Sequence, residues 1–322
     1  MTHLRIAGAP ITWGICEVPG WGHQLAPERV LSEMRALGLT ATELGPEGYL
    51  PAEPDDLNAF LDSAGFQLVG GFVPVVLHRE DVWAAELARA TRAADLLASC
   101  RAEVLVIAAA LGTTGYDRRA ELDAAGWTTL VRSVDRIVDT GAERDLTIVL
   151  HPHHGTVVDR RVHVERLLEL SSVGLCLDTG HLFLGGADPV DIVRAAGDRI
   201  AHVHLKDIAA DVARQVSSGT LDYRDAVRHG LYRPLGAGDA GVAETIRSLE
   251  AAGYRGWYVL EQDRVLDRSA DNGRGPMRDA EQSVAFLERI TGGTHRAPAK
   301  AELEGSAARD AAGGGRSVDK SS

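Results

Sequence analysis

The chain has 322 residues, and with 45% of them hydrophobic it can form one large domain or two ordinary ones. Its 34 basic and 46 acidic residues give a formal net charge of −12, which disfavours a polyanion such as nucleic acid as a partner. Three scattered cysteines, Cys16, Cys100 and Cys176, are too few for a disulfide framework or a thiolate metal site. We interpret them as reduced residues in or near the core.

The N-terminal sequence Met-Thr-His-Leu-Arg-Ile lacks the pattern of a signal peptide. No apolar run reaches the roughly 18 residues that a membrane span needs. We therefore expect a cytoplasmic protein with no membrane partner.

Taken in order, apolar runs alternate with amphipathic segments along most of the chain. The strands are expected at residues 6–13, 40–44, 67–77, 104–111 and 147–150, in the runs around Leu175 and His204, and at 257–260. The helices are expected at residues 27–37, 54–65, 81–99, 127–138, 162–170, 188–199, 242–253 and 277–290. Eight strand and helix pairs with continuously apolar strands favour a closed (β/α)8 TIM barrel over residues 1–291, rather than an open doubly wound sheet.

Two segments depart from this repeat. The pattern weakens over residues 208–240, where we expect an insertion at the active rim with some short helix of its own. Residues 292–322 have almost no large apolar side chains, so we expect a disordered tail there. The glycines of residues 236–241 fit the GxGxxG pattern, but no buried strand precedes them and no βαβ unit follows, so we interpret them as a rim loop and not as a dinucleotide site.

Polar side chains follow four consecutive expected strands. His151 follows the fifth strand, Asp178 ends the sixth, His204 the seventh, and Glu261 follows the eighth. Neighbouring parallel strands point their carboxyl ends the same way, so these side chains should meet at one rim of the barrel. Taken alone, each histidine could equally be a half-buried polar residue. Together, the nitrogen and oxygen donors predict a divalent metal site, with Mn or Co favoured and Fe, Zn or Mg as alternatives.

At these residues the chain resembles the xylose-isomerase-like barrel superfamily of sugar isomerases and epimerases, and most closely its inosose (2-keto-myo-inositol) dehydratases. The matching motifs are Ala-Pro-Ile-Thr-Trp at 9–13, Thr-Glu-Leu-Gly at 42–45, His-His-Gly-Thr-Val-Val at 153–158, Leu-Asp-Thr-Gly-His at 177–181, His-Val-His-Leu-Lys-Asp at 202–207, Pro-Leu-Gly-Ala-Gly-Asp at 234–239, Gly-Tyr and Gly-Trp at 253–257, and Glu-Gln-Asp at 261–263. They span most of the chain up to about residue 290.

The resemblance implies a metal-dependent enzyme that acts on a polyhydroxylated ketone, a small polyol or keto-sugar. Many superfamily members have Glu after the fifth strand, and two Glu residues then combine metal binding with proton transfer. Here that position holds His151. Because an imidazole bound to a metal cannot also collect a substrate proton, this departure favours a dehydratase, a hydro-lyase of inositol catabolism, over two-Glu epimerase chemistry.

Four residues are candidates for proton transfer during dehydration: Glu261, Glu43, His181 and Lys206. The sequence does not rank them. Three of them have a plainer alternative: Lys206 could only hold a carboxylate, Glu43 could only hydrogen-bond a ligand, and His181 could orient Asp178 or bind a substrate hydroxyl.

Two further residues are expected to bind the substrate. His153 has the same parity along its strand as His151, whereas His154 should point to the other face. Trp13 is expected to line the sugar pocket, and Trp257 is expected to lie in the core.

Other functions stay open at this point. They are a sugar or sugar-phosphate isomerase or epimerase, a lyase for a 3-keto-glycoside, and a catalytically silent sugar-binding barrel. A phosphodiesterase of the endonuclease type would need a basic groove, which the charge of −12 opposes. A homo-oligomer is also possible from the sequence.

Overall fold

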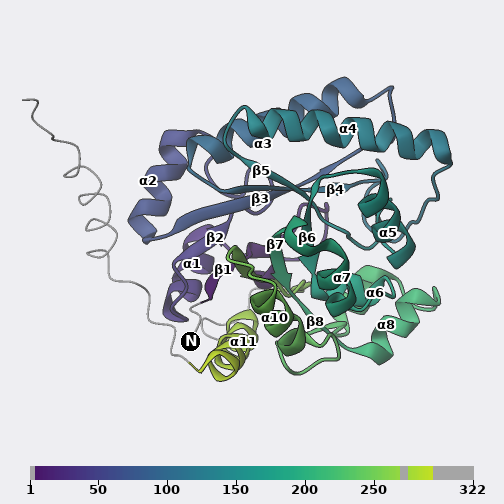
Figure 1. The fold of residues 1–322 in the computed structure, drawn as a ribbon. Coiled ribbons are helices and arrows are strands. Elements are labelled where there is room, and N and C mark those ends of the chain that lie inside the picture. Colours follow the sequence, from purple (N-terminus) through teal and green to yellow (C-terminus); the bar gives the residue numbers. More distant parts are fainter. Residues whose placement is uncertain (1–3, 269–274, 293–322) are drawn as a thin grey trace, which may run out of the picture.

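The computed structural model describes residues 4–268 and 275–292 of the chain. Eight parallel strands close into a barrel in the order β1, β10, β7, β6, β5, β4, β3, β2 (Figure 1). The barrel strands are β1 (Arg5–Gly8), β2 (Ala41–Glu43), β3 (Gln67–Val75), β4 (Val104–Ala109), β5 (Thr147–Leu150), β6 (Gly174–Asp178), β7 (Ile200–Leu205) and β10 (Trp257–Leu260). The predicted (β/α)8 barrel is confirmed. The expected tail lies outside the described residues beyond Gly292.

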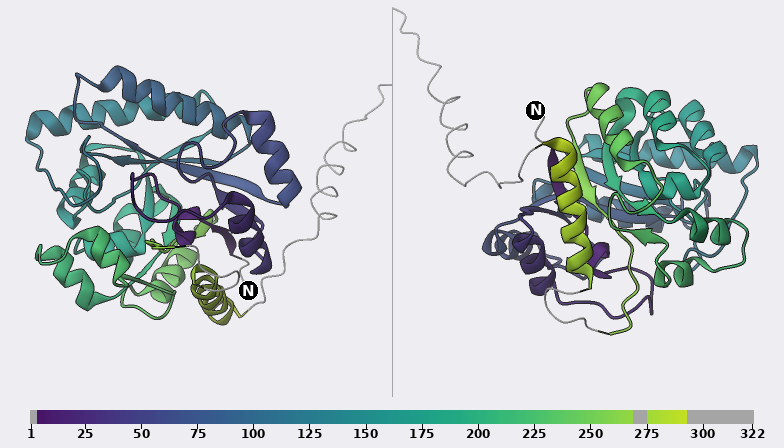
Figure 2. Two further views of the ribbon diagram at one scale, coloured as in Figure 1. Left: turned by 180° about the vertical axis from the view of Figure 1, so that it is seen from behind. Right: turned by 90° about the horizontal axis from the view of Figure 1, so that it is seen from below.

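Helices surround the barrel and connect its strands (Figure 1). They are α1 (Pro27–Ala36), α2 (Pro54–Ala64), α3 (Trp83–Ser99), α4 (Ala124–Ala142), α5 (Arg161–Leu170), α6 (Thr179–Leu184), α7 (Pro189–Ala196), η2 (Gly197–Arg199), α10 (Val242–Ala251) and α11 (Pro276–Thr291). Several begin at a proline, whose fixed φ suits a first helical turn, and Asp123 and Asp188 cap α4 and α7 with their side chains. The last helix, α11, packs against the N-terminal 3₁₀ turn, so the two ends of the barrel sequence meet (Figure 2).

The first predicted strand is shorter than expected. β1 ends at Gly8, and residues Pro10–Trp13 form the 3₁₀ turn η1. Proline lacks an N–H group, so the chain cannot extend the sheet ladder through Pro10. The turn buries Trp13 completely, and its indole Nε1 donates to Glu33 Oε2 at 2.8 Å.

The apolar side chains inside the barrel are mostly smaller than those in the layer between the strands and the helices. That layer holds the large apolar cluster of the protein, rich in Leu and Ile. Two small clusters are separate from it: one of Ala7, Ala9, Ala41, Val69, Trp257 and Val259, the other of Val104, Val106, Val149 and Cys176. Their members alternate along the strands with residues of the large cluster, as period-two side chains must. These mostly small residues leave room above them for imidazoles and carboxylates.

The insertion expected at residues 208–240 is present. It contains β8 (Asp207–Ile208), α8 (Ala210–Ser217), α9 (Tyr223–Arg228) and β9 (Tyr232–Arg233), and β8 pairs antiparallel with β9. The glycine-rich loop follows β9 and wraps around the buried carboxylate of Asp207. That carboxylate accepts N–H bonds from Gly236 at 2.8 Å and from Gly238 and Ala240 at 3.0 Å. The loop thus binds an anion of this chain itself, consistent with a structural rim loop.

The cysteines agree with the sequence interpretation, because Cys16, Cys100 and Cys176 are free and buried. Across residues 4–268 and 275–292, no helix combines the length and the hydropathy that a membrane span requires.

Candidate metal centre

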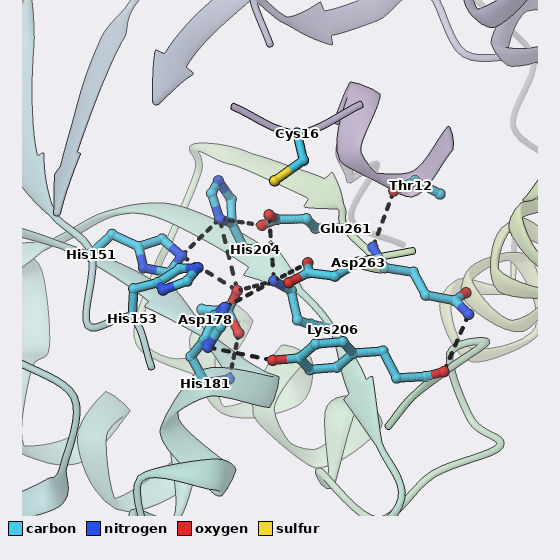
Figure 3. Close-up of polar contacts among 12 residues, drawn as sticks. Thr12, Cys16, His151, His153, Asp178, His181, His204, Lys206, Glu261 and Asp263 are labelled. Carbon is cyan, nitrogen blue, oxygen red and sulfur yellow. Dashed lines mark hydrogen bonds and ion pairs between the residues drawn. The ribbon is translucent and has the colours of Figure 1, made fainter. Parts of the chain in front are cut away.

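The four predicted ligands meet at the carboxyl ends of β5, β6, β7 and β10. His151, Asp178, His204 and Glu261 each place one ligand atom within 4.8 Å of the others. Strand register explains part of this, because Asp178 of β6 pairs directly with His204 of β7. Figure 3 shows the side chains converging from their separate strands.

The geometry of these atoms fits a cation. His204 Nδ1 lies 3.1 Å from His151 Nε2 and 2.5 Å from Glu261 Oε2. The second oxygens of the two carboxylates, Asp178 Oδ2 and Glu261 Oε2, are buried and accept no aligned hydrogen bond from any residue that the structure describes. Buried carboxylate oxygens without donors are costly, and a metal ion among these four side chains would satisfy them.

Local structure orients Asp178 for this role. It ends β6 and caps α6, with Oδ1 accepting the backbone N–H of His181 at 2.7 Å. The cap leaves Oδ2 turned toward His151 Nε2, 3.4 Å away. Gly180 is required beside it, because a Cβ there would lie 2.7 Å from Lys206 Cγ.

Glu43 reaches the centre from β2, on the opposite side of the barrel. Its Oε1 lies 2.8 Å from His202 Nε2 and 3.0 Å from His204 Nε2. Burial raises the pKa of Glu43, but the two imidazoles outweigh that effect and hold it below the ordinary value. If a metal binds here, an ionised Glu43 that accepts the Nε2 proton of His204 would leave Nδ1 of that imidazole as the ligand atom.

Lys206 lies fully buried behind the metal ligands. Its Nζ donates to Asp263 Oδ1 at 2.7 Å and lies 3.4 Å from Glu261 Oε1 and 3.5 Å from Asp178 Oδ2. Burial lowers the pKa of Lys206, but the carboxylates of Asp178, Asp263 and Glu261 overcome this and raise it well above the ordinary value. Lys206 is therefore an ammonium ion that balances the local negative charge.

His153 and His154 point in different directions, as their parity predicts. The imidazole of His153 packs on that of His181, with ring centroids 3.9 Å apart, whereas His154 stacks on Tyr223. His153 Nδ1 lies 2.7 Å from the carbonyl oxygen of His154. An N–H there leaves Nε2 as the acceptor, and burial lowers the pKa of His153 well below its ordinary value. His153 is thus a neutral imidazole.

His181 also lies close to the centre. Its Nε2 is 3.1 Å from Lys206 Nζ, and its Nδ1 is 3.3 Å from the backbone N–H of His154. Burial, followed by the charges of His153 and Lys206, lowers the pKa of His181 well below the ordinary value. His181 therefore links α6 to Lys206 as a neutral group.

A cavity of about 890 Å³ opens onto this centre. His151, His153, Glu43, Glu261 and Asp263 line it, whereas His181 and Lys206 are not among its lining residues. Trp13 does not line it either, because η1 turns its indole into the core. The tryptophan on the cavity wall is Trp21, whose Nε1 donates to the carbonyl oxygen of Arg264 at 2.7 Å.

Comparison with known proteins shows the family of the chain. A family model described as a xylose isomerase-like TIM barrel matches residues 31–290. The chain belongs to the xylose isomerase-like TIM barrel family. Within it, the chain is 33% identical over 272 residues to an inosose dehydratase from Geobacillus kaustophilus, covering 81% of this chain and 88% of that protein. It is also 33% identical over 271 residues to the rhizopine catabolism protein MocC from Rhizobium meliloti, covering 81% and 82%.

Solved structures show the same fold. The L-ribulose 3-epimerase structure has a TM-score of 0.66 at 14% identity, covering 98% of this chain and 100% of the other. The probable 3-DHS dehydratase AsbF from Bacillus anthracis has a TM-score of 0.65 at 15% identity, covering 88% and 99%. At these identities the likeness concerns the fold alone.

Three residues near the metal ligands were not predicted from the sequence: Asp263, Tyr223 and Tyr232. Asp263 bonds Lys206 and also accepts from the hydroxyl of Tyr223 at 2.6 Å, and Tyr232 lies 3.1 Å from that hydroxyl. Both tyrosines come from the insertion, where no strand pattern places them. Asp263 carried a signal, since it lies two residues after Glu261 and so shares its parity.

Proposed function

We propose that the protein is a divalent-metal-dependent hydro-lyase that removes water from a keto-inositol or a closely related polyhydroxylated ketone. The observation that carries the proposal is the imidazole at the end of β5. With His151 among the four ligands, the set contains two carboxylates, Asp178 and Glu261. Of these two, only Glu261 is among the residues that line the cavity. The inosose dehydratase relatives support the same reaction class.

The metal would be held by His151, Asp178, His204 and Glu261, a mixed nitrogen and oxygen set that favours Mn or Co. When bound, such a cation supplies Lewis-acid stabilisation of the negative charge that develops beside a ketone.

Glu261 is the proton acceptor that we propose. Burial raises its pKa, but His204 and Lys206 outweigh burial and hold it below the ordinary value, so the carboxylate is ionised at neutral pH. It can take the proton α to the ketone and return it to the β-hydroxyl, so that the C–O bond breaks and water leaves. Glu261 thus acts first as the base and then as the acid, on one face of the ring.

The other candidates receive supporting roles in this proposal. Glu43 holds the His204 ring, and Lys206 holds Glu261, Asp178 and Asp263 in place. His153 lines the cavity with an acceptor nitrogen that suits a substrate hydroxyl.

Product analysis tests the proposal. Purified protein loaded with Mn or Co is incubated with a panel of keto-inositols and ketoses, and products are analysed by mass spectrometry and NMR. We expect loss of one water from a keto-inositol. Products of unchanged mass with one inverted stereocentre would instead identify an epimerase.

A further inference from the structure

A closed ring of five polar side chains lies beside the proposed base. Lys206 Nζ lies 2.7 Å from Asp263 Oδ1 and 3.1 Å from His181 Nε2. The Tyr223 hydroxyl lies 2.6 Å from Asp263 Oδ2. The Tyr232 hydroxyl closes the ring, 3.1 Å from that of Tyr223 and 3.4 Å from His181 Nδ1. All five side chains are buried, and of the five only Asp263 lines the cavity.

Within this ring, the Lys206 ammonium is shared unequally between two carboxylates. Its Nζ is 2.7 Å from Asp263 Oδ1 but 3.4 Å from Glu261 Oε1 (Figure 3). Glu261 Oε2 lies toward the metal ligands, 2.5 Å from His204 Nδ1. With Oε2 at the metal, Oε1 is the oxygen left for a substrate proton, and a closer ammonium would occupy it. Asp263 attracts the ammonium and so leaves Glu261 Oε1 accessible.

The direction of the Asp263 carboxylate depends on Tyr223. Among the residues that the structure describes, the Tyr223 hydroxyl is the only donor to Asp263 Oδ2. Burial, followed by the charge of Asp263, raises the pKa of Tyr223 well above its ordinary value, so the hydroxyl keeps its proton and donates at neutral pH. Without this donor, the carboxylate would turn toward water in the cavity that Asp263 lines. Lys206 would then lose its nearest carboxylate and move onto Glu261.

Tyr223 is itself fixed by contacts that do not involve its hydroxyl. Its backbone N–H, at the start of α9, donates to Asp117 Oδ1 at 2.8 Å. Its ring stacks on that of His154, with centroids 4.8 Å apart, and Trp21 of the cavity wall is a further ring neighbour at 6.3 Å. Tyr223→Phe keeps all of these contacts. The hydroxyl can therefore be removed without removing the packing of the insertion.

We propose that Tyr223 is a positioning residue for proton transfer. Its hydroxyl holds Asp263 so that Asp263 takes the shortest hydrogen bond of the Lys206 ammonium and Glu261 Oε1 is left for the substrate proton. No residue of the insertion at 208–240 lines the cavity, so the insertion contributes to turnover without touching the substrate. This inference rests on the proposed role of Glu261 as the base, and it deepens that function by naming a residue that keeps the base accessible.

Tyr223→Phe tests the inference by steady-state kinetics of the metal-loaded enzyme with a keto-inositol. We expect kcat to fall by about 10- to 100-fold, with KM changed by less than about threefold and bound metal unchanged, because the hydroxyl contacts neither the cavity nor a ligand atom. Tyr258→Phe is the matched control, since this buried tyrosine donates to Glu250 Oε1 at 3.0 Å, outside the metal centre. It should leave kcat unchanged. Unchanged kcat in Tyr223→Phe, or a rise in KM alone, would overturn the inference.

A double variant separates positioning from a general loss of structure. Asp263→Asn removes the carboxylate through which Tyr223 acts, so adding Tyr223→Phe to it should lower kcat by less than about twofold further. Equal losses from Tyr223→Phe in the two backgrounds would show that the hydroxyl acts independently of Asp263, and would overturn the inference.

Failure of the proposed function is a separate outcome. Exchange of the hydrogen beside the ketone with D₂O, followed by NMR, reports proton transfer even where no water is lost. If the wild type exchanges this hydrogen without losing water, the proposed dehydration is wrong. An exchange that is about 10- to 100-fold slower in Tyr223→Phe still supports the inference in that case, and equal exchange rates overturn it.

Discussion

The two halves of the barrel rim differ in chemistry, one being polar and the other mixed. On the β5, β6, β7 and β10 side, the strands end in the buried set His151, Asp178, His204 and Glu261. On the β1–β4 side, the cavity wall mixes apolar residues such as Leu44 and Leu96 with charged ones such as Glu47 and Arg89. From this side Glu43 reaches across to His204. A barrel lets each strand end vary independently, so one half can hold reacting groups and the other can shape the space for a substrate.

The halves also differ in how they are held. The polar half is fixed by charge: Asp178 caps α6, Lys206 joins three carboxylates, and Asp207 holds the glycine-rich loop. The mixed half is fixed by packing of Leu44 and Leu96 on the main core. Substitutions in the polar half should therefore have large and specific effects, and those in the mixed half small ones.

The largest expected effect is on turnover. Glu261→Gln keeps one oxygen for a metal but cannot accept a proton, so we expect kcat to fall by about 100- to 1000-fold with the metal still bound. Glu47→Gln is the control from the mixed half, because Glu47 is an exposed residue of the cavity wall. Near-normal turnover of metal-loaded Glu261→Gln would make Glu261 a ligand only, and the base would then be sought among Glu43, His181 and Lys206.

The next effect is on metal affinity. His151→Ala removes one donor, and we expect metal affinity to fall by at least about 10- to 100-fold, with part of the turnover restored by excess metal. His154→Ala is the matched control, because this histidine stacks on Tyr223 and is absent from the ligand set. Equal metal affinities of the two variants, by competition with a chelating dye, would remove His151 from the centre.

A smaller effect concerns stability. Asp207→Asn places an amide NH₂ group against backbone N–H donors, so we expect a loss of about 1–3 kcal/mol in the free energy of unfolding. Denaturant unfolding measures it, with Asp211→Asn on the exposed face of α8 as control. If both variants unfold alike, the loop does not depend on the Asp207 charge.

The smallest effect is expected at the C-terminus. The sequence from Gly293 to Ser322 lacks a core-forming pattern, so truncation after Thr291 should change neither turnover nor the melting temperature by more than a few degrees. A large drop in melting temperature would show that these residues dock on the barrel.

The parts of the molecule that could be predicted are those with local or periodic signals. Apolar runs located the strands, and the rule that parallel strands end at one rim brought Asp178 beside His204, as their register confirms. The end of β1 was wrong because Pro10 breaks the sheet ladder, a local signal that the apolar run concealed. The prediction that Trp13 lines the substrate pocket was wrong for the same reason, since the 3₁₀ turn directs its indole into the core.

Long-range contacts account for what the sequence did not reveal. Tyr223 and Asp263 are 40 residues apart and meet through an insertion whose path has no periodic pattern. Glu43 and His204 are 161 residues apart, so proximity across the barrel, and not spacing, makes Glu43 a partner of that imidazole.

Metal dependence is the most direct test of the account. Protein freed of metal by exhaustive chelation is assayed for loss of water from a keto-inositol, before and after stepwise addition of Mn or Co, with bound metal measured in parallel. We predict no turnover without metal, and turnover that rises in proportion to bound metal. Full activity in metal-free protein would contradict it.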